Sequence, residues 1–246
     1  MTFTSSKILL ISLFLAVSSV VHAANVPSYN DALQKFFSDS ANKGKSPFTP
    51  EEHKLMKNSA DALSKQLPNP GLKVGEPAPD FNLPNAMGKP VALSNMLKQG
   101  PVVMVFYRGA WCPFCNLHLH TLNKALPEFK KYGAQLVTIT PQTPDKSAEQ
   151  LVKDNFPFEV LSDLDSKVMK AYKMHFELSP EIVSLYKKHG LDVEVFNGKG
   201  RTELPIPGTF VIDQKGVIRA VHAETDYKQR MEPAAILKAL KEIGAK

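Results

Sequence analysis

The feature that most constrains this chain of 246 residues is a Cys-x-x-Cys motif at residues 112–115, between a predicted strand and a predicted helix. The apolar run at residues 101–105 predicts a buried strand, and residues 116–132 predict a helix. Cys112 therefore lies at a helix N-terminus, where free backbone N–H groups and the helix dipole favour an anion. We expect a lowered pKa for the Cys112 thiol, with Cys115 shielded one turn deeper in the helix.

The chain has two cysteines, both in this motif. A domain held by structural disulfides usually has several spaced pairs, and a Cys-x-x-Cys disulfide closes too small a loop to stabilise a fold strongly. The pair therefore indicates redox chemistry. A zinc site with His118 or His120 is the alternative, but histidines two residues apart on a helix point to different sides. We expect no metal and no cofactor.

The N-terminus has the pattern of an export signal. Lys7 precedes an uncharged, mostly apolar run at residues 8–21, and Val21-His22-Ala23 resembles a cleavage site. The run is short for a membrane span, although an uncleaved anchor is the alternative. We expect residues 1–23 to be a signal peptide, the mature protein to be periplasmic or secreted, and its membrane association to be lost after cleavage.

The mature chain divides into a helical extension at residues 24–72 and an α/β domain at residues 73–246. A strong helix start within the extension has Thr49 as its N-cap, followed by Pro and two Glu residues. We expect the extension to pack on the main domain, with a homodimer surface as the alternative. From Lys73 onwards short strands alternate with helices, which is typical of an α/β sheet. The segment 174–201 interrupts this pattern as an insertion.

The formal charge of +6 comes from scattered lysines, without a dense block of Lys and Arg. This distribution indicates a solvated basic surface and not a nucleic-acid interface.

Four stretches of the domain resemble peroxiredoxin-like proteins of the alkyl hydroperoxide reductase C/thiol-specific antioxidant (AhpC/TSA) family. They are Gly75-x-x-Ala78-Pro79-Asp80-Phe81, residues 105–115, residues 207–213 and Asp226-Tyr227-x-x-Arg230. The resemblance implies a thioredoxin-like fold, a mixed central sheet flanked by helices. It also implies that Cys112 is the attacking (peroxidatic) thiol, that Cys115 resolves it, and that Pro207 is a cis proline facing the pair.

Two positions depart from the family pattern. Peroxiredoxins usually have a Thr three residues before the attacking cysteine, where this chain has Gly109, and an Arg before the late strand, where it has Pro207. Arg108 is a candidate for the missing positive charge at the thiolate, although an Arg at a helix end also forms ordinary salt bridges. Both departures weaken the expectation of fast peroxide reduction.

Three activities remain open at this point. The leading hypothesis is an exported thiol peroxidase that reduces a hydroperoxide through the two cysteines and is reset by a thioredoxin-like protein. The second is a protein thiol–disulfide oxidoreductase of the TlpA/thioredoxin type, in which Trp111 and Pro207 would shape a groove for the client. The third is a redox-sensing module without turnover.

Overall fold

The structure is a computed structural model that describes residues 26–41 and 46–244. The predicted signal peptide lies outside these residues. Within them, no helix combines the length and the apolar character that are needed to cross a bilayer.

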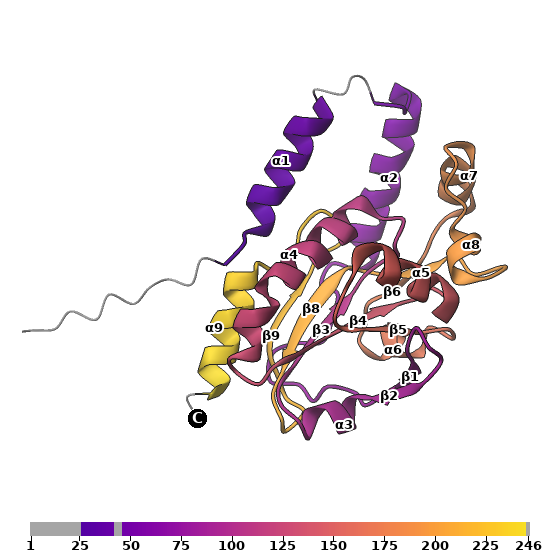
Figure 1. Cartoon of the computed structure of the whole chain (residues 1–246). Helices are drawn as coiled ribbons and strands as arrows, with labels where there is room; N and C mark the ends of the chain where they lie inside the picture. The colour runs from indigo at the N-terminus through magenta and orange to yellow at the C-terminus, as the bar shows by residue number, and fades with distance from the viewer. Residues whose placement is uncertain (1–25, 42–45, 245–246) are drawn as a thin grey trace, which may run out of the picture.

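A five-stranded mixed sheet lies at the centre of the fold (Figure 1). Its strands are β3 (Val102–Phe106), β4 (Gln135–Thr140), β5 (Glu159–Ser162), β8 (Gly208–Ile212) and β9 (Ile218–Ala223). Their order in the sheet is β5-β4-β3-β8-β9. The first three run parallel, whereas β8 is antiparallel to both β3 and β9. This arrangement is the predicted thioredoxin-like sheet, in which β8 and β9 form an antiparallel hairpin.

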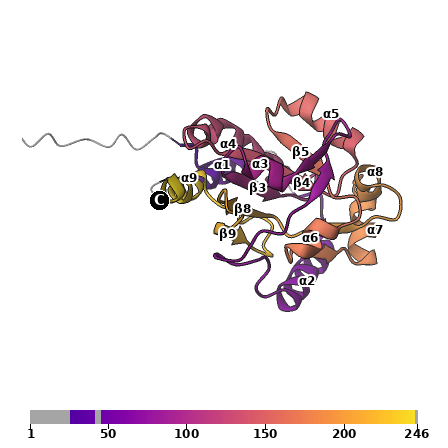
Figure 2. The same ribbon diagram turned by 90° about the horizontal axis from the view of Figure 1, so that it is seen from below.

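Helices cover both faces of this sheet (Figure 2), and two short strand pairs lie outside it. The helices are α1 (Tyr29–Ala41), α2 (Pro50–Gln66), α3 (Leu93–Leu97), α4 (Pro113–Lys130), α5 (Pro144–Asp154), α6 (Lys167–Ala171), α7 (Pro180–Lys188), α8 (Val193–Asn197) and α9 (Pro233–Gly244). The antiparallel pairs are β1 (Asn82–Pro84) with β2 (Pro90–Ala92), and β6 (His175–Glu177) with β7 (Glu203–Pro205). The inserted segment therefore contains β6, α7 and α8.

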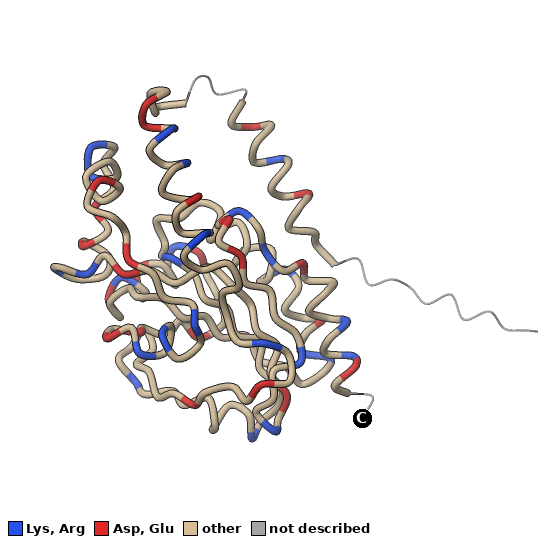
Figure 3. Tube along the Cα trace, turned by 180° about the vertical axis from the view of Figure 1, so that it is seen from behind, with Lys and Arg blue, Asp and Glu red and all other residues tan. Residues whose placement is uncertain are grey.

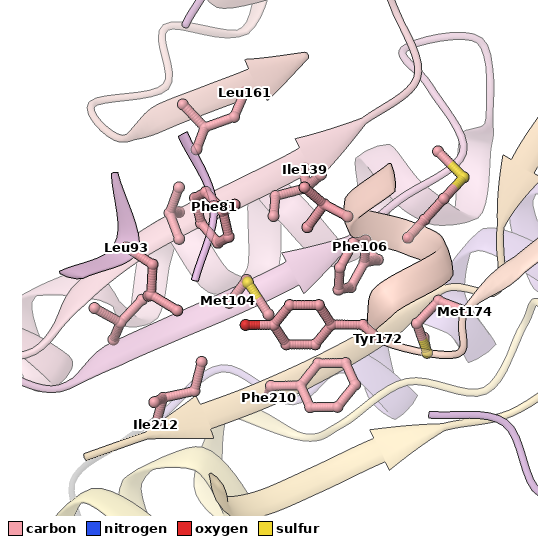
Figure 4. Close-up of a cluster of buried hydrophobic side chains, with 14 of the residues drawn as sticks. Phe81, Leu93, Met104, Phe106, Ile139, Leu161, Tyr172, Met174, Phe210 and Ile212 are labelled. Carbon is pink, nitrogen blue, oxygen red and sulfur yellow. The ribbon is translucent and has the colours of Figure 1, made fainter. Parts of the chain in front are cut away.

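The alternation of side chains along β3 divides the core into two layers. Val103 and Val105 pack with α4 and α9 on one face. Met104 and Phe106 point to the other face, where the Phe106 ring lies 5.4 Å from the Tyr172 ring and 5.9 Å from the Phe210 ring (Figure 4). Because every residue of β3 is buried, the strand that leads to the cysteines is held from both sides.

Both helices of the N-terminal extension contact the main domain. Tyr29 of α1 is fully buried; its hydroxyl donates to the Lys228 carbonyl at 2.8 Å, and its ring meets the His118 ring edge-on at 5.4 Å. The predicted N-cap of α2 is confirmed, since Thr49 and Glu52 form a capping box. The Glu52 carboxylate also accepts hydrogen bonds from Lys188 at 2.7 Å and His189 at 3.1 Å at the end of α7. This carboxylate therefore links the extension to the insertion.

The link between α2 and α7 should weaken in acid. Hydrogen bonds from Lys188 and the Thr49 backbone lower the pKa of Glu52 to about 2 from an ordinary value of 4.5. A carboxyl group with a lowered folded-state pKa stabilises the fold above its unfolded pKa and loses that contribution as the pH falls towards 2. The protection of the α2 and α7 amides, measured as hydrogen exchange relative to the intrinsic rate at each pH, should therefore decrease between about pH 4.5 and pH 2, and Glu52→Gln should show the lower protection already at pH 7. Glu51→Gln, at an exposed position one residue earlier, is the control and should behave as wild type.

Charged residues are distributed over the whole described trace, with Lys and Arg interspersed among Asp and Glu (Figure 3). The lysines nearest to carboxylates form exposed ion pairs such as Lys35–Asp39 and Lys57–Asp61. Such pairs contribute little to stability individually. The pattern matches the solvated surface expected from the sequence.

Candidate active site

The two cysteines lie where the chain passes from β3 into α4. Cys112 is the N-cap of α4, and its Sγ accepts a hydrogen bond from the Cys115 backbone N–H at 3.3 Å. Pro113 follows as the first helical residue, a position at which proline loses no helical hydrogen bond. Both cysteines are free thiols, with 0% and 1% of their surface exposed. The placement predicted from the sequence is therefore correct, and the sulfur of Cys112 is in contact with the helix N-terminus.

Arg108 is buried next to Cys112 and does not form the salt bridge that was its alternative role. Its guanidinium donates a hydrogen bond to Cys112 Sγ at 3.2 Å. The same group lies between two aromatic rings, 5.2 Å from the centre of Trp111 and 4.2 Å from that of Tyr227, where cation–π attraction favours it. Among the described residues, no carboxylate lies within 4 Å of this guanidinium. The cation therefore has a sulfur as its nearest potential anion.

Arg230 holds the corresponding position beside the second cysteine. It is 7% exposed, and its guanidinium lies 3.6 Å from Cys115 Sγ. Its other hydrogen bonds go to the backbone carbonyls of Tyr227 and Gln229. The family resemblance includes this residue but assigns it no role, and no local pattern could have done so, because it lies 115 positions after Cys115 in an irregular loop without periodicity.

The two thiols titrate as a pair. Burial raises the pKa of the Cys112 thiol, as does its hydrogen bond to Cys115, and the Arg108 charge offsets only part of this increase. Burial also raises the pKa of the Cys115 thiol, but the hydrogen bond from Cys112 and the charges of Arg230 and Arg108 hold that pKa well below its usual value. The prediction of a lowered pKa for Cys112 itself is wrong, because burial and the neighbouring Cys115 outweigh the Arg108 charge. The pair loses its first proton easily and retains its second.

Buried amide side chains fix the loop that carries Arg108. The side-chain oxygen of Gln142, at the end of β4, accepts a hydrogen bond from the Ala110 N–H at 2.7 Å. Asn116 of α4 donates to the Ala110 carbonyl at 2.6 Å and accepts from Gln150 of α5 at 3.1 Å. Gln150 in turn accepts a hydrogen bond from the Tyr107 hydroxyl at 2.8 Å. This network was not predicted, because its members come from separate elements; it holds Tyr107 in the core, where its side chain is buried.

Gly109 explains the absence of the usual Thr. Its φ angle is +146°, a conformation that side chains disfavour. A Cβ atom there would lie 2.5 Å from Trp111 Nε1 and 2.8 Å from Trp111 Cδ1. The indole of Trp111 therefore occupies the space that a Thr side chain would need.

Gly109→Thr should destabilise the fold by about 3 kcal/mol, through backbone strain and the clash with Trp111. Equilibrium unfolding in urea measures this free energy. Gly133→Thr is a matched control, because Gly133 has a φ of +68° but no atom within 4 Å of the position that a Cβ would take. The Gly109 variant should lose clearly more stability than the control; equal losses would show that Trp111 does not compete for the space.

A cavity of about 470 Å³ opens next to Arg108 and is covered by parts of the chain outside the central sheet. Ile182 and Tyr186 of α7 line one side, and Met56 and Leu63 of α2 line another. The Tyr186 ring lies 6.1 Å from that of Trp111. The insertion and the extension thus form two walls of a cavity next to Arg108.

Pro207 lines the same cavity, but its predicted cis peptide bond is wrong. All described peptide bonds are trans. The trans form is intrinsically favoured by about 0.5–1 kcal/mol before proline. Here the chain enters β8 at Gly208 immediately afterwards, and Ile206 is anchored by its hydrogen bond to the Met174 carbonyl. No contact among the described residues of this region requires the cis form.

The histidines near the motif belong to separate environments. His118 is buried and its ring contacts the Met231 carbonyl at 3.3 Å, whereas His120 faces Asp154 at 3.5 Å on a more exposed side of α4. The described residues contain no group of three or more His, Cys, Asp or Glu side chains placed to hold a metal ion.

Comparisons with known proteins place the chain in a family. The family model described as "AhpC/TSA family" matches residues 74–221. Peroxiredoxin Bcp of Escherichia coli (strain K12) is 30% identical over 172 residues, which cover 70% of this chain and 97% of that protein. Chloroplastic peroxiredoxin Q of Populus jackii is 28% identical over 148 residues, covering 60% of this chain. The chain spans 59% of the length of that relative.

A further relative has a different activity in its name. Thiol-disulfide oxidoreductase ResA of Geobacillus kaustophilus (strain HTA426) is 24% identical over 160 residues, covering 65% of this chain and 74% of that protein. Among solved structures, peroxidoxin BcpB from Mycobacterium tuberculosis aligns with a TM-score of 0.56 and 25% identity, covering 70% of this chain and 98% of that chain. The family model covers more than half of the sequence and the topology agrees with it, so the chain belongs to the AhpC/TSA family and has its thioredoxin-like fold.

Proposed function

We propose that this protein is a thiol peroxidase that reduces hydrogen peroxide or a small organic hydroperoxide. The observation that carries the proposal is the contact of Cys112 Sγ with both the N-terminus of α4 and the guanidinium of Arg108, a residue that lines a cavity. A helix N-terminus and a fixed cation stabilise both a thiolate and the negative charge that develops on a peroxide oxygen. Membership of the peroxiredoxin-containing family supports the same reaction.

The reaction begins with one proton shared by the two sulfurs. When that proton lies on Cys115, the Cys112 thiolate attacks the terminal oxygen of ROOH; the O–O bond breaks, giving Cys112 sulfenic acid and RO⁻. RO⁻ takes the proton of the Cys115 thiol and leaves as ROH. The Cys115 thiolate then attacks the Cys112 sulfur, forming the disulfide and releasing hydroxide, which leaves as water with one proton from solvent.

A dithiol reductant must then return two electrons to the disulfide. A thioredoxin-like protein is the partner that the family resemblance favours, and thiol–disulfide exchange through a mixed disulfide is the chemistry. Export through the N-terminal signal would place this reaction in the periplasm or outside the cell. Sequencing of the N-terminus of the exported protein should give Ala24 as the first residue, and recovery of an intact Met1 in the membrane fraction would favour an anchor.

Protein dithiol–disulfide exchange is the second candidate function. It is favoured by Pro207 at the position of the usual arginine, by Trp111 beside the thiol, and by the similarity to ResA. Burial of both sulfurs argues against it, because a client protein must bring its own sulfur into line with Cys112.

Turnover with dithiothreitol as the reductant distinguishes the two functions. The peroxidase proposal predicts that catalytic amounts of protein consume hydrogen peroxide well above the dithiothreitol blank, while insulin disulfides are reduced no faster than in the blank. Fast insulin reduction together with peroxide consumption at the blank rate would favour the exchange function. Oxidised protein prepared with diamide provides the disulfide form in both assays.

A further inference from the structure

We propose that Arg230 is the electrostatic partner of Cys115 and that, together with Arg108, it makes the Cys112–Cys115 disulfide a strong oxidant. The proposal rests on the redox function proposed for the pair. It assigns one buried guanidinium to each sulfur, Arg108 at 3.2 Å from Cys112 and Arg230 at 3.6 Å from Cys115. Neither guanidinium lies within 4 Å of a carboxylate in the described part of the chain.

A buried cation without a counter-ion destabilises a protein, so the charge state of the sulfurs matters to both arginines. In the reduced pair, one thiolate shared by the two sulfurs lies in contact with both guanidiniums. Formation of the disulfide removes that negative charge, and the two buried cations lose their nearest anion. The reduced state is therefore stabilised relative to the oxidised state, which is the property that makes a disulfide strongly oxidising.

Other titratable groups around the pair do not compensate for this loss. Burial raises the pKa of Tyr29, to about 12, and also those of Tyr107 and Tyr186, so all three hydroxyls are neutral at pH 7. Burial lowers the pKa values of His118 and His222, so both imidazoles are uncharged above pH 6.5. The loop that carries Arg230 also holds Tyr227, which stacks on Arg108, Asp226 and Lys228, which line the cavity, and Glu224, which is exposed. Glu232, at the end of this loop, accepts hydrogen bonds from the backbone N–H groups of Tyr29 and Asn30. None of these side chains forms a hydrogen bond or ion pair with either sulfur or with the Arg230 guanidinium in the described part of the chain.

The number of protons released when glutathione reduces the disulfide tests this arrangement. Two glutathione thiols reduce the disulfide to the singly charged pair, and oxidised glutathione and one proton are released. The equilibrium constant for reduction of the disulfide by glutathione should therefore increase about tenfold per pH unit between pH 6 and pH 7.5, where glutathione itself is protonated. If both cysteines were protonated in the reduced protein, no proton would be released and the equilibrium would not depend on pH.

The experiment is a redox titration of the full mature chain with mixtures of reduced and oxidised glutathione, analysed by acid quenching and alkylation. For the wild-type protein, the equilibrium constant for reduction should increase about tenfold per pH unit. Arg230→Gln should shift the equilibrium towards the disulfide by about tenfold at pH 7, which corresponds to about 30 mV, and should flatten the pH dependence. Arg230→Lys keeps the positive charge, so it should restore much of the wild-type equilibrium constant and much of its pH dependence. Arg219→Gln is the control, since Arg219 bonds Asp213 at 2.7 Å and should leave the equilibrium unchanged.

Three results would overturn the proposal. The first is a wild-type equilibrium constant that does not depend on pH. The second is an Arg230→Gln variant with the same equilibrium constant as wild type. The third is an Arg230→Gln variant whose equilibrium constant shifts but keeps the full pH dependence, as expected if Arg230 has only a structural role. Because no peroxide is present, the titration is independent of the peroxidase assay. A protein that shows the tenfold dependence but does not react with peroxide would keep this inference and lose the proposed function.

Discussion

Replacement of Cys112 by Ser is expected to lower peroxide turnover by at least about a thousandfold, because the hydroxyl that replaces the thiol stays protonated at neutral pH and is a poor nucleophile. The loss should appear in the rate of peroxide consumption with dithiothreitol as reductant. Folding should be retained, since the substitution keeps the size of a buried side chain that accepts a backbone hydrogen bond. Activity retained in this variant would contradict the mechanism for both candidate functions.

Cys115→Ser is the matched variant for the second step. It should still react once with peroxide, because the attacking sulfur and Arg108 are intact. Without the resolving thiol, the product should be a sulfenic acid on Cys112, visible as a mass increase of one oxygen atom and trapped by dimedone. Formation of no adduct would show that the first oxidation occurs at Cys115, the sulfur that holds the lower pKa in the reduced pair.

The second large effect is expected for Arg108→Gln, with a loss of roughly a hundredfold in the rate of Cys112 oxidation at pH 7. The charge of Arg108 lowers the pKa of the Cys112 thiol, and its Nη2 donates directly to the sulfur. Removal of this charge raises the pH at which the thiolate forms, so the pH–rate profile should move to higher pH and part of the loss should be recovered in alkaline solution.

Two controls make the Arg108 result specific. Arg219→Gln removes an arginine of β9 that is paired with Asp213, and it should react at the wild-type rate. Arg108→Lys keeps the charge but loses the planar group that lies between Trp111 and Tyr227, so an intermediate rate is expected. A rate for Arg108→Gln within a factor of two of wild type would show that the helix N-terminus alone activates the sulfur.

The parts of the site that could be predicted from the sequence are those encoded within a few residues. The apolar run of β3 is buried throughout, Pro113 begins α4, and Cys112 caps it, as the strand–motif–helix pattern indicates. The Thr49 capping box follows from an equally local signal. Short-range rules suffice in these places because the hydrogen bonds close within one helical turn.

The parts that could not be predicted depend on contacts between distant segments. Arg230 reaches Cys115 from an irregular loop, and α7 brings Tyr186 to the cavity from an insertion. The pKa of Cys112 depends on its burial, on the neighbouring Cys115 and on the charges of Arg108 and Arg230. Its position at a helix N-terminus alone therefore led to the wrong direction for this pKa. The trans bond before Pro207 likewise reflects its local setting and not the family pattern.

The most direct test of the peroxidase proposal is stopped-flow oxidation of the reduced mature protein by hydrogen peroxide, followed by Trp111 fluorescence. Trp111 is the only tryptophan and lies 5.2 Å from the Arg108 guanidinium that contacts Cys112, so its emission should report the loss of the thiolate. We predict a second-order rate constant at least about a hundredfold above that of a free thiolate of equal pKa, because Arg108 and the helix N-terminus stabilise the transition state. A rate constant equal to that of the free thiolate would contradict the peroxidase proposal and leave disulfide exchange as the function of the pair.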